Sequence, residues 1–183
     1  MVKIIKKITF LSLVTFFCTK IYSNSYEIVV DVSEQRLYLK QFSKVVESFP
    51  ISTSKYGEGS IENSFKTPLG FHEIKEKIGD NVLVNTIFVA RNNTGKVANI
   101  IKSPINTESD HVTSRILWLN GLESGINNGT GVDSYSRYIY IHGTPYEDQL
   151  GWPSSAGCIR MSNQDVIELF NKTQIKTQVN ILP

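Results

Sequence analysis

Residues Tyr26 to Ser52 read YEIVVDVSEQRLYLKQFSKVVESFPIS, and this stretch decides the fold class. It holds three short runs in which apolar and polar residues tend to alternate, YEIVVD, RLYLK and KVVESFPIS, separated by short polar breaks that contain Ser. A period of two places successive side chains on opposite faces of an extended chain, as in a β-strand with one buried face. The stretch therefore predicts three strands joined by turns.

Comparable runs recur along the rest of the chain, at VLVNTIFVAR (82–91), RILWL (115–119), RYIYIHG (137–143) and TQVNIL (177–182). Many short strands connected by turns are typical of antiparallel sheets that close on themselves or pack in two layers. We therefore expect a mainly β fold, an antiparallel sandwich or barrel-like single domain with one or two short helices packed against it.

One helix is predicted from about Asn163 to Asn171. Ser162 is expected to cap its first turn, and Asp165 completes a Ser-x-x-Asp capping box. The apolar positions that follow fall on one helical face, and they are Val166, Ile167, Leu169 and Phe170. This face is expected to pack against the sheet.

Two long segments show neither a strand nor a helix pattern: residues 53–70 and residues 120–136. Loops of this length are uncommon inside a compact domain and are often lids or binding loops. The second segment leads directly into the run 137–143, so we expect it to border a substrate cleft. A mobile insertion is the alternative for each segment.

The composition excludes several classes of protein. The chain has 183 residues, 40% hydrophobic and 20% charged, with a formal net charge of +2. No basic run follows the first seven residues, so a nucleic-acid partner is not expected. His72 and His111 lack the spaced Cys, His or carboxylate partners of a zinc site, and we expect them in turns or on the surface. No metal or other cofactor is predicted.

The first 25 residues have the pattern of a secretory signal peptide. A cationic head, MVKIIKK, precedes an apolar stretch of eleven residues that ends at Cys18. A transmembrane helix needs roughly 20 apolar residues, so the stretch is too short to span a bilayer. We expect cleavage that leaves a mature chain starting between Asn24 and Tyr26, a periplasmic location, and one catalytic domain over residues 26–183. An uncleaved anchor or a lipoprotein lipidated at Cys18 are the alternatives.

Removal of that segment leaves Cys158 as the one cysteine of the mature chain. A free thiol is often a small buried residue. Here, however, fifteen residues, 143–157, many of them Gly or Pro, separate it from His142 at the end of a predicted strand. The entropic cost of loop closure grows only slowly with length, so the chain can return the thiol to the imidazole.

A Cys-His pair suits nucleophilic acyl transfer. A thiol has an ordinary pKa of about 8.5, and a neighbouring histidine favours the reactive thiolate and later returns the proton to a leaving amine. Gly157 leaves room for an approaching carbonyl, and the amides of Gly157 and Cys158 are candidate oxyanion donors. Arg160 is expected on the same face as Cys158, where it either binds a substrate carboxylate or forms a structural ion pair.

The strings IHGTP and LGWPSSAGCIRMSNQDVIELF, with the earlier ISTSKYGEGS and KTPLGFHEI, resemble the L,D-transpeptidase catalytic domain, also called YkuD-like. The resemblance runs from about Tyr26 to Pro183. It implies a β-rich domain with a packed helix and peptidoglycan stem peptides as the substrate. In its site, Cys158 is the nucleophile, His142 is the base, and the carbonyl of Gly143 orients the imidazole.

Further motif positions of the resemblance match Arg160 and Ser155, which we assign to substrate binding. One position departs from the family pattern, because Ala156 stands where the family usually has His. This departure affects the substrate fit beside the thiol and leaves the base, His142, in place. The resemblance also implies covalent inhibition by carbapenems.

The implied reaction releases D-alanine from a tetrapeptide stem and passes the acyl group to an amine. That amine belongs to diaminopimelate of a neighbouring stem or to a lysine of an anchored lipoprotein. Two alternatives stay open: a hydrolase on the same fold, acting as an L,D-carboxypeptidase or amidase, and a non-catalytic wall-binding module. The membrane is expected as a partner only during export.

Overall fold

The computed structural model describes residues 26–101 and 111–183. The predicted signal peptide, residues 1–25 with Cys18, lies outside these residues. The strands within them are β1 (Tyr26–Asp31), β2 (Arg36–Gln41), β3 (Lys44–Pro50), β4 (Gly70–Ile78), β5 (Thr86–Val89), β6 (Asn92–Val97), β7 (Val112–Gly121), β8 (Tyr140–Gly143), β9 (Ile159–Met161) and β10 (Gln178–Leu182). The helices are the 3₁₀ turn η1 (Glu147–Gln149) and α1 (Asn163–Lys172). None of these helices is long and apolar enough to cross a membrane.

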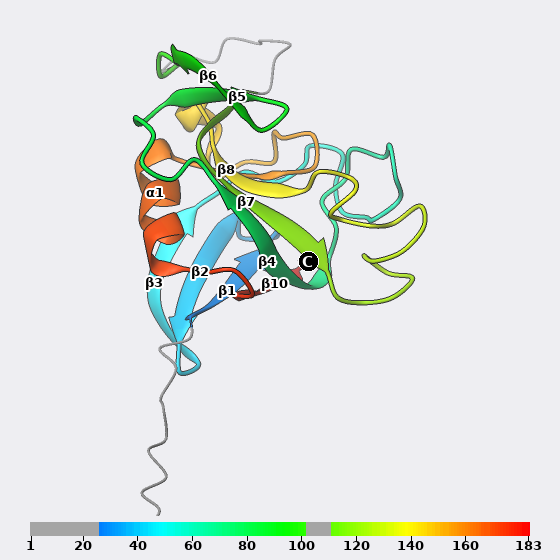
Figure 1. Ribbon diagram of the computed structural model, residues 1–183. Helices are drawn as coiled ribbons and strands as arrows, with labels where there is room; N and C mark the ends of the chain where they lie inside the picture. Colours follow the sequence, from blue (N-terminus) through cyan, green and yellow to red (C-terminus); the bar gives the residue numbers. More distant parts are fainter. Residues whose placement is uncertain (1–25, 102–110) are drawn as a thin grey trace, which may run out of the picture.

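The ten strands form one sheet, which confirms the mainly β prediction (Figure 1). Its order is β3-β2-β1-β10-β4-β7-β5-β6, and β8 branches from β7 to pair with β9. Neighbours are antiparallel except for two parallel pairs, β1 with β10 and β8 with β9. The parallel pair β8–β9 matters for function because it brings the region of His142 beside the region of Cys158.

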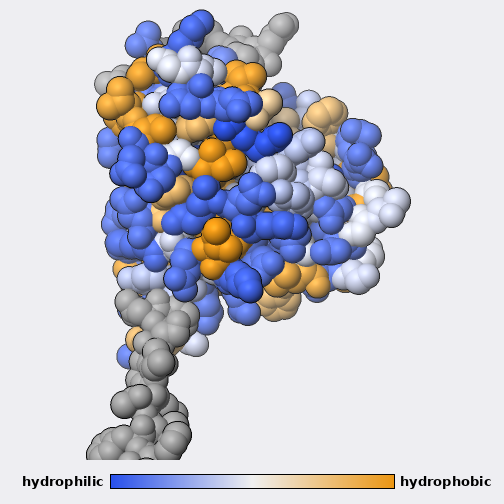
Figure 2. Space-filling model, in the orientation of Figure 1, coloured by the Kyte–Doolittle hydropathy of each residue, from blue (hydrophilic) through white to orange (hydrophobic). Residues whose placement is uncertain are grey.

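The buried faces of the alternating strands contribute their side chains to one hydrophobic core. Ile28 and Val30 of β1 and Leu37 and Leu39 of β2 are fully buried, as a strand with one buried face requires. Apolar residues of β3, β4, β7–β10 and α1 join the same core. On the outside, hydrophobic side chains form separate patches among hydrophilic ones on the face drawn in Figure 2.

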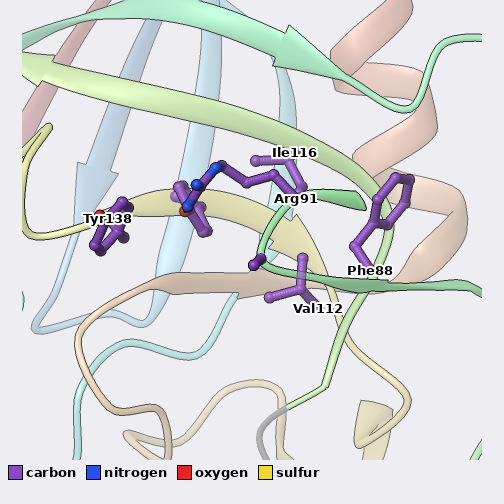
Figure 3. A pocket seen from close by; sticks show the side chains of 7 residues that line it. Phe88, Arg91, Val112, Ile116 and Tyr138 are labelled. Carbon is purple, nitrogen blue, oxygen red and sulfur yellow. The ribbon is translucent and has the colours of Figure 1, made fainter. Parts of the chain in front are cut away.

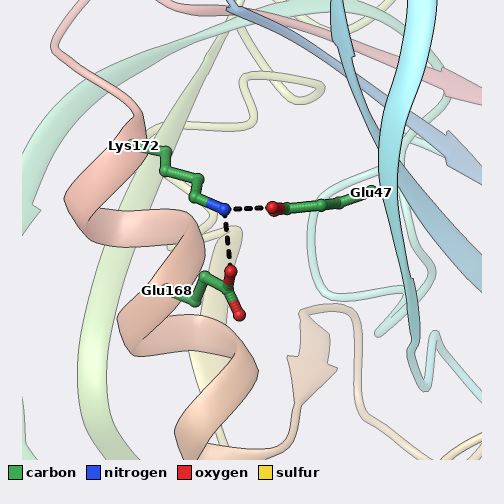
Figure 4. Close-up of polar contacts among 3 residues, drawn as sticks. All are labelled: Glu47, Glu168 and Lys172. Atoms are coloured by element: carbon green, nitrogen blue, oxygen red, sulfur yellow. Dashed lines mark hydrogen bonds and ion pairs between the residues drawn. The ribbon is translucent and has the colours of Figure 1, made fainter.

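The helix forms as its capping box predicts. The amide of Asp165 donates to the side-chain oxygen of Ser162 at 3.1 Å, and α1 begins at the next residue, Asn163. Three of the four predicted apolar positions are buried: Val166, Leu169 and Phe170. At the other end, Lys172 forms ion pairs with Glu168 on the helix and with Glu47 on β3, which joins α1 to the sheet edge (Figure 4).

Some strand boundaries differ from the sequence pattern. The run 82–91 contributes only Thr86–Val89, because Asn85 has a positive φ and the residues before it turn. The run 137–143 contributes only Tyr140–Gly143, because Tyr138 also has a positive φ. In addition, β4 and β6 carry no clean alternation, and every residue of β6 is exposed.

The segment that follows β3 positions the cysteine loop. Ser52 exchanges two backbone hydrogen bonds with Arg160, at 2.9 and 3.0 Å, and the amide of Lys55 donates to the carbonyl of Ser155 at 3.0 Å. The hydroxyl of Thr67 donates to the carbonyl of Gly157 at 3.0 Å. The first long loop, residues 53–70, therefore supports the turn that carries Cys158.

Candidate active site

His142 lies in β8 with its side chain 1% exposed. Its Nδ1 is 2.8 Å from the carbonyl oxygen of Gly143, which can only accept a hydrogen bond. Nδ1 therefore carries the hydrogen, and the neutral ring has its lone pair on Nε2. This tautomer is the one that a general base needs, with Nε2 as the accepting nitrogen.

Gly143 has to be a glycine for steric reasons. A Cβ at this position would lie 2.7 Å from the carbonyl oxygen of Thr113 and 2.8 Å from Oδ1 of Asn163. The strand can therefore approach β7 and the start of α1 closely only without a side chain here. The close approach fixes the carbonyl that holds the imidazole of His142.

Cys158 is half-buried and its sulfur contacts the backbone of the chain that leads into β8. The amide of Tyr140 donates to Sγ at 3.4 Å, and Sγ lies 3.3 Å from the carbonyl oxygen of Tyr138. The parallel register pairs His142 with Arg160, two residues beyond Cys158. The two residues that the sequence singled out therefore lie on adjacent segments, His142 in β8 and Cys158 just before β9.

The turn before the thiol is held from inside by Ser155. Its hydroxyl donates to the carbonyl of Cys158 at 2.6 Å and accepts from the amide of Gly157 at 3.2 Å. Gly157 has φ +122°, a conformation that L side chains rarely adopt. Ser155 is fully buried, so its contacts favour a role in shaping this turn over direct contact with substrate.

Arg160 is 5% exposed and its guanidinium contacts the neighbouring loop. It donates to Oε1 of Gln149 at 3.2 Å, to the carbonyl of Ser154 at 2.9 Å and to the hydroxyl of Ser154 at 3.4 Å. Ile159 and Met161 turn into the core on either side, as expected for an extended segment. These contacts are all with uncharged groups and hold the loop that precedes Cys158, while substrate binding by Arg160 and the alternative of an ion pair both stay predictions.

Two cavities lie beside the thiol. The smaller, of about 170 Å³, is lined by Glu62, Asn63, Phe65, Ser136, Arg137, Tyr138, Ile139 and Ala156. Both long loops contribute to it, which agrees with the expectation that residues 120–136 border a cleft. The amide of Glu62 donates to the carbonyl of Gly131 at 2.8 Å, so the loops are also joined to each other.

Arg137 is a residue of this cavity that the sequence did not single out. It donates to the carbonyls of Lys66 at 2.8 Å and Gly59 at 3.4 Å. Burial lowers the pKa of Arg137, while the negative charge of Cys158 raises it. Arg137 therefore lies within electrostatic reach of Cys158, where its positive charge favours the ionised form of a thiol, and it shares this cavity with Ala156.

The larger cavity, of about 430 Å³, lies on the other side of Tyr138. Phe88, Val112 and Ile116 form its apolar wall, and Arg91 extends across it toward Tyr138 (Figure 3). Tyr138 and Tyr140 line this cavity and also contact the sulfur of Cys158 through their backbones. Arg91 was also absent from the sequence prediction, because no motif connects it with Cys158.

His72 corrects a sequence prediction. We expected a turn or surface histidine, but His72 lies in β4 and is fully buried. Its Nδ1 donates to the carbonyl of Gly70 and its Nε2 accepts from the hydroxyl of Ser134, both at 2.9 Å. Within residues 26–101 and 111–183, no group of His, Cys, Asp or Glu could hold a metal ion.

The family model of the L,D-transpeptidase catalytic domain, YkuD, matches residues 25–181. The chain belongs to this family. Enzymes of the YkuD family are cysteine-dependent transpeptidases that act on peptidoglycan stem peptides. A search of curated protein sequences found no match.

Solved structures, L,D-transpeptidases among them, share the fold. An L,D-transpeptidase from Mycobacterium smegmatis superimposes with a TM-score of 0.52 at 14% identity, over 87% of this chain and 59% of that one. L,D-transpeptidase 3 from Mycobacterium tuberculosis, which carries a faropenem-derived adduct, gives 0.53 at 16% identity, over 87% and 60%. Bd1075 from Bdellovibrio bacteriovorus gives 0.54 at 17% identity, over 87% and 48%. The chain thus spans about half to three-fifths of these proteins.

Proposed function

We propose that this YkuD-family protein is a peptidoglycan L,D-transpeptidase with Cys158 as its nucleophile and His142 as its general base. The observation that carries the proposal is the placement of the thiol. Sγ contacts the backbone of Tyr138 and Tyr140, and His142, in the strand that Tyr140 begins, is fixed through Nδ1. Tyr138 lines both cavities, so in our proposal one cavity receives the donor peptide and the other the acceptor.

In the proposed first step, Nε2 of His142 takes the proton of the Cys158 thiol and Sγ attacks the carbonyl of the L,D-peptide bond. A C–S bond forms, and the carbonyl oxygen becomes an oxyanion. The imidazolium then returns its proton to the nitrogen of D-alanine as the C–N bond breaks. The product is a thioester with the tripeptide stem, and free D-alanine leaves.

In the second step, an amine attacks the thioester carbonyl and loses its proton to His142. The C–S bond breaks, and the released thiolate takes the proton back. A diaminopimelate side chain of another stem and a lipoprotein lysine both fit this chemistry. The acceptor stays bound to the acyl group, so the product shows which of them reacted. Water in place of the amine would give the hydrolase outcome.

The oxyanion needs hydrogen-bond donors that point at the developing charge. The amide of Gly157 donates to Ser155 Oγ at 3.2 Å, a bond at the long end of the usual range. In our proposal the oxyanion competes with this hydroxyl for the Gly157 amide, and the amide of Cys158 is the second donor. The Gly157 φ of +122° sets the direction of this peptide and requires a residue without Cβ.

Incubation of residues 26–183 with disaccharide tetrapeptides tests the proposed function. Mass analysis of the products is expected to show cross-linked dimers and free D-alanine. Tripeptide monomers without dimers would show hydrolysis, and unchanged substrate would support a non-catalytic wall-binding module. The matched control is Cys158→Ala, which removes the nucleophile and is expected to form no product.

We also propose export to the periplasm, where this substrate lies. The support is the sequence alone, the cationic head and the eleven-residue apolar stretch, because residues 1–25 are not among those described. N-terminal sequencing of the protein recovered from the periplasm is expected to start between Asn24 and Tyr26. An intact Met1 on a cytoplasmic protein would contradict the proposal.

A further inference from the structure

The β5–β6 hairpin presents Arg91 from an unusual turn. Ala90 and Arg91, the two residues between the strands, have φ +46° and +69°. Two-residue turns with both residues at positive φ normally use Asn and Gly, because a Cβ makes this backbone region unfavourable. Interactions of the Arg91 side chain have to hold the turn in place.

The guanidinium of Arg91 lies in an aromatic cup. Its Cζ is 4.8 Å from the ring centroid of Trp118 and 4.9 Å from that of Tyr138, both within cation–π range. Its Nη1 donates to the hydroxyl of Tyr140 at 3.3 Å. The hairpin therefore places a cation over the chain that holds the sulfur of Cys158.

This cation faces the larger of the two cavities. Phe88, Val112 and Ile116 supply an apolar wall, and Arg91 reaches from that wall toward Tyr138 (Figure 3). Tyr138 and Tyr140 line the cavity and also hold the sulfur of Cys158. The carbonyl oxygen of Tyr138 lies 3.3 Å from Sγ, and the amide nitrogen of Tyr140 lies 3.4 Å from it. A ligand in this cavity therefore lies next to the reacting sulfur.

Among the residues that the structure describes, no acid balances the charge of Arg91. Within residues 26–101 and 111–183, no Asp or Glu forms an ion pair with it, and the charged or polar neighbours that raise its pKa are Tyr140, Tyr138 and Tyr135. A guanidinium beside apolar walls is complementary to a carboxylate, which it binds through two parallel hydrogen bonds. The hydrogen bond to Tyr140 uses only one of its donors.

We infer that Arg91 is a specificity-determining residue that binds a free carboxylate of the peptide in this cavity. The inference rests on the proposed function, because stem peptides supply such carboxylates. Two of them lie close to the reacting atoms, the terminal carboxylate of D-alanine and the side-chain carboxylate of diaminopimelate. The cup positions the guanidinium, and the apolar wall contacts the aliphatic part of the residue that bears the carboxylate.

Binding by the Cys158→Ala protein tests the inference separately from turnover. The probes are tetrapeptide stems with both carboxylates free, with the D-alanine carboxylate amidated, and with the diaminopimelate carboxylate amidated. Hydrogen bonds to charged groups contribute about 1.5–3 kcal/mol, so one amidation is expected to weaken binding about 10- to 100-fold. Which probe loses affinity identifies the carboxylate.

The Cys158→Ala, Arg91→Met protein is expected to bind the free and amidated probes equally, within a factor of about two. Arg91→Lys keeps the charge without the bidentate geometry and is expected to retain part of the preference. The matched control is Lys96→Met, on the exposed strand β6 of the same hairpin, which should keep the full preference. Thermal unfolding of each variant checks that the fold is retained.

Two results would overturn the inference. One is equal binding of all three probes by the Cys158→Ala protein. The other is an Arg91→Met protein that binds every probe more weakly but keeps the preference for free carboxylates, which is the behaviour of a residue that only fastens the hairpin. Release of D-alanine by the wild-type protein, measured in parallel, reports on the proposed function. That release can succeed while this inference fails.

Discussion

Cys158 and His142 owe their orientation to main-chain groups. The imidazole is fixed by the carbonyl of Gly143, and the sulfur contacts the backbone of Tyr138 and Tyr140. Backbone partners do not change when neighbouring side chains do. Ala156, the departure from the family pattern, therefore leaves these backbone contacts of the proposed Cys-His pair in place.

The burial of His72 predicts that the free energy of unfolding depends on pH. Burial lowers its pKa from the ordinary value of 6.5; Glu123 and the backbone bond to Gly70 oppose the effect, and Arg137 adds to it. Below pH 6.5, His72 is protonated in the unfolded chain while it is still neutral in the folded chain. The free energy of unfolding is therefore expected to fall as the pH falls from about 6.5 toward the lowered value.

Denaturant unfolding at a series of pH values checks this expectation. His72→Gln cannot titrate, so its stability is expected to change less than that of the wild type between pH 7 and pH 5. The two proteins share all their other titratable groups, so the difference between their stability curves isolates the contribution of His72. Parallel curves for the two proteins would show that His72 titrates alike in both states.

Local sequence was enough to find some site residues and not others. The His142 to Cys158 spacing and the flanking glycines are local signals, and the parallel register of β8 and β9 places the two residues on adjacent segments. Arg91, in the turn of the β5–β6 hairpin, and Arg137, just after the second long loop, line the two different cavities. Nothing in their own sequence neighbourhoods indicates this, because their position depends on tertiary contacts.

Among the larger elements, the second long loop is anchored and not a loose insertion. The side chain of Asn127 is fully buried and donates to the carbonyls of Leu69 and Phe71 at 2.9 and 3.2 Å. Its Oδ1 accepts from the amide of Glu123 at 2.9 Å. One side chain therefore ties the loop to itself and to β4.

Asn127→Ala is expected to lower the free energy of unfolding by about 3 kcal/mol, because it removes three hydrogen bonds between a fully buried side chain and the backbone. Deletion of residues 127–131, which would remove the anchor, is expected to damage folding as well as turnover. The control is Thr130→Ala, at an exposed position of the same loop. Equal unfolding midpoints for the two variants would contradict the anchoring role.

Strands were predictable from the sequence where alternation is clear and one face is buried. β1, β2 and β10 meet this condition, whereas β7 was found from its apolar run RILWL and is buried on both faces. β4 was missed because charged residues interrupt its pattern, and β6 because it has no buried face to produce one. The parallel pairs could not be predicted either, because the sequence of a single strand does not indicate which distant strand it pairs with.

For the molecule as a whole, β1 is central although it begins the described part of the chain. It pairs with β2 on one side and with β10 on the other, so the two ends of the domain meet in the sheet. Residues 26–183 are therefore expected to fold without residues 1–25. Removal of β1 as well leaves two strands unpaired on one side.

Thermal unfolding followed by circular dichroism checks this expectation. Residues 26–183 should show one cooperative transition, while residues 33–183, which lack β1, should show none. Addition of a peptide with the sequence of residues 26–32 offers a further control, because it supplies the missing strand in trans. A cooperative transition in the shorter chain without the peptide would contradict the central place of β1.

The most direct test of the Cys158–His142 assignment is intact-protein mass spectrometry after reaction with a carbapenem, whose strained lactam carbonyl takes the place of the donor peptide carbonyl. Attack by Sγ opens the ring to a thioester. One drug adduct is expected on residues 26–183, a much slower adduct on His142→Ala, and none on Cys158→Ala. An adduct that forms equally well on Cys158→Ala would contradict the assignment.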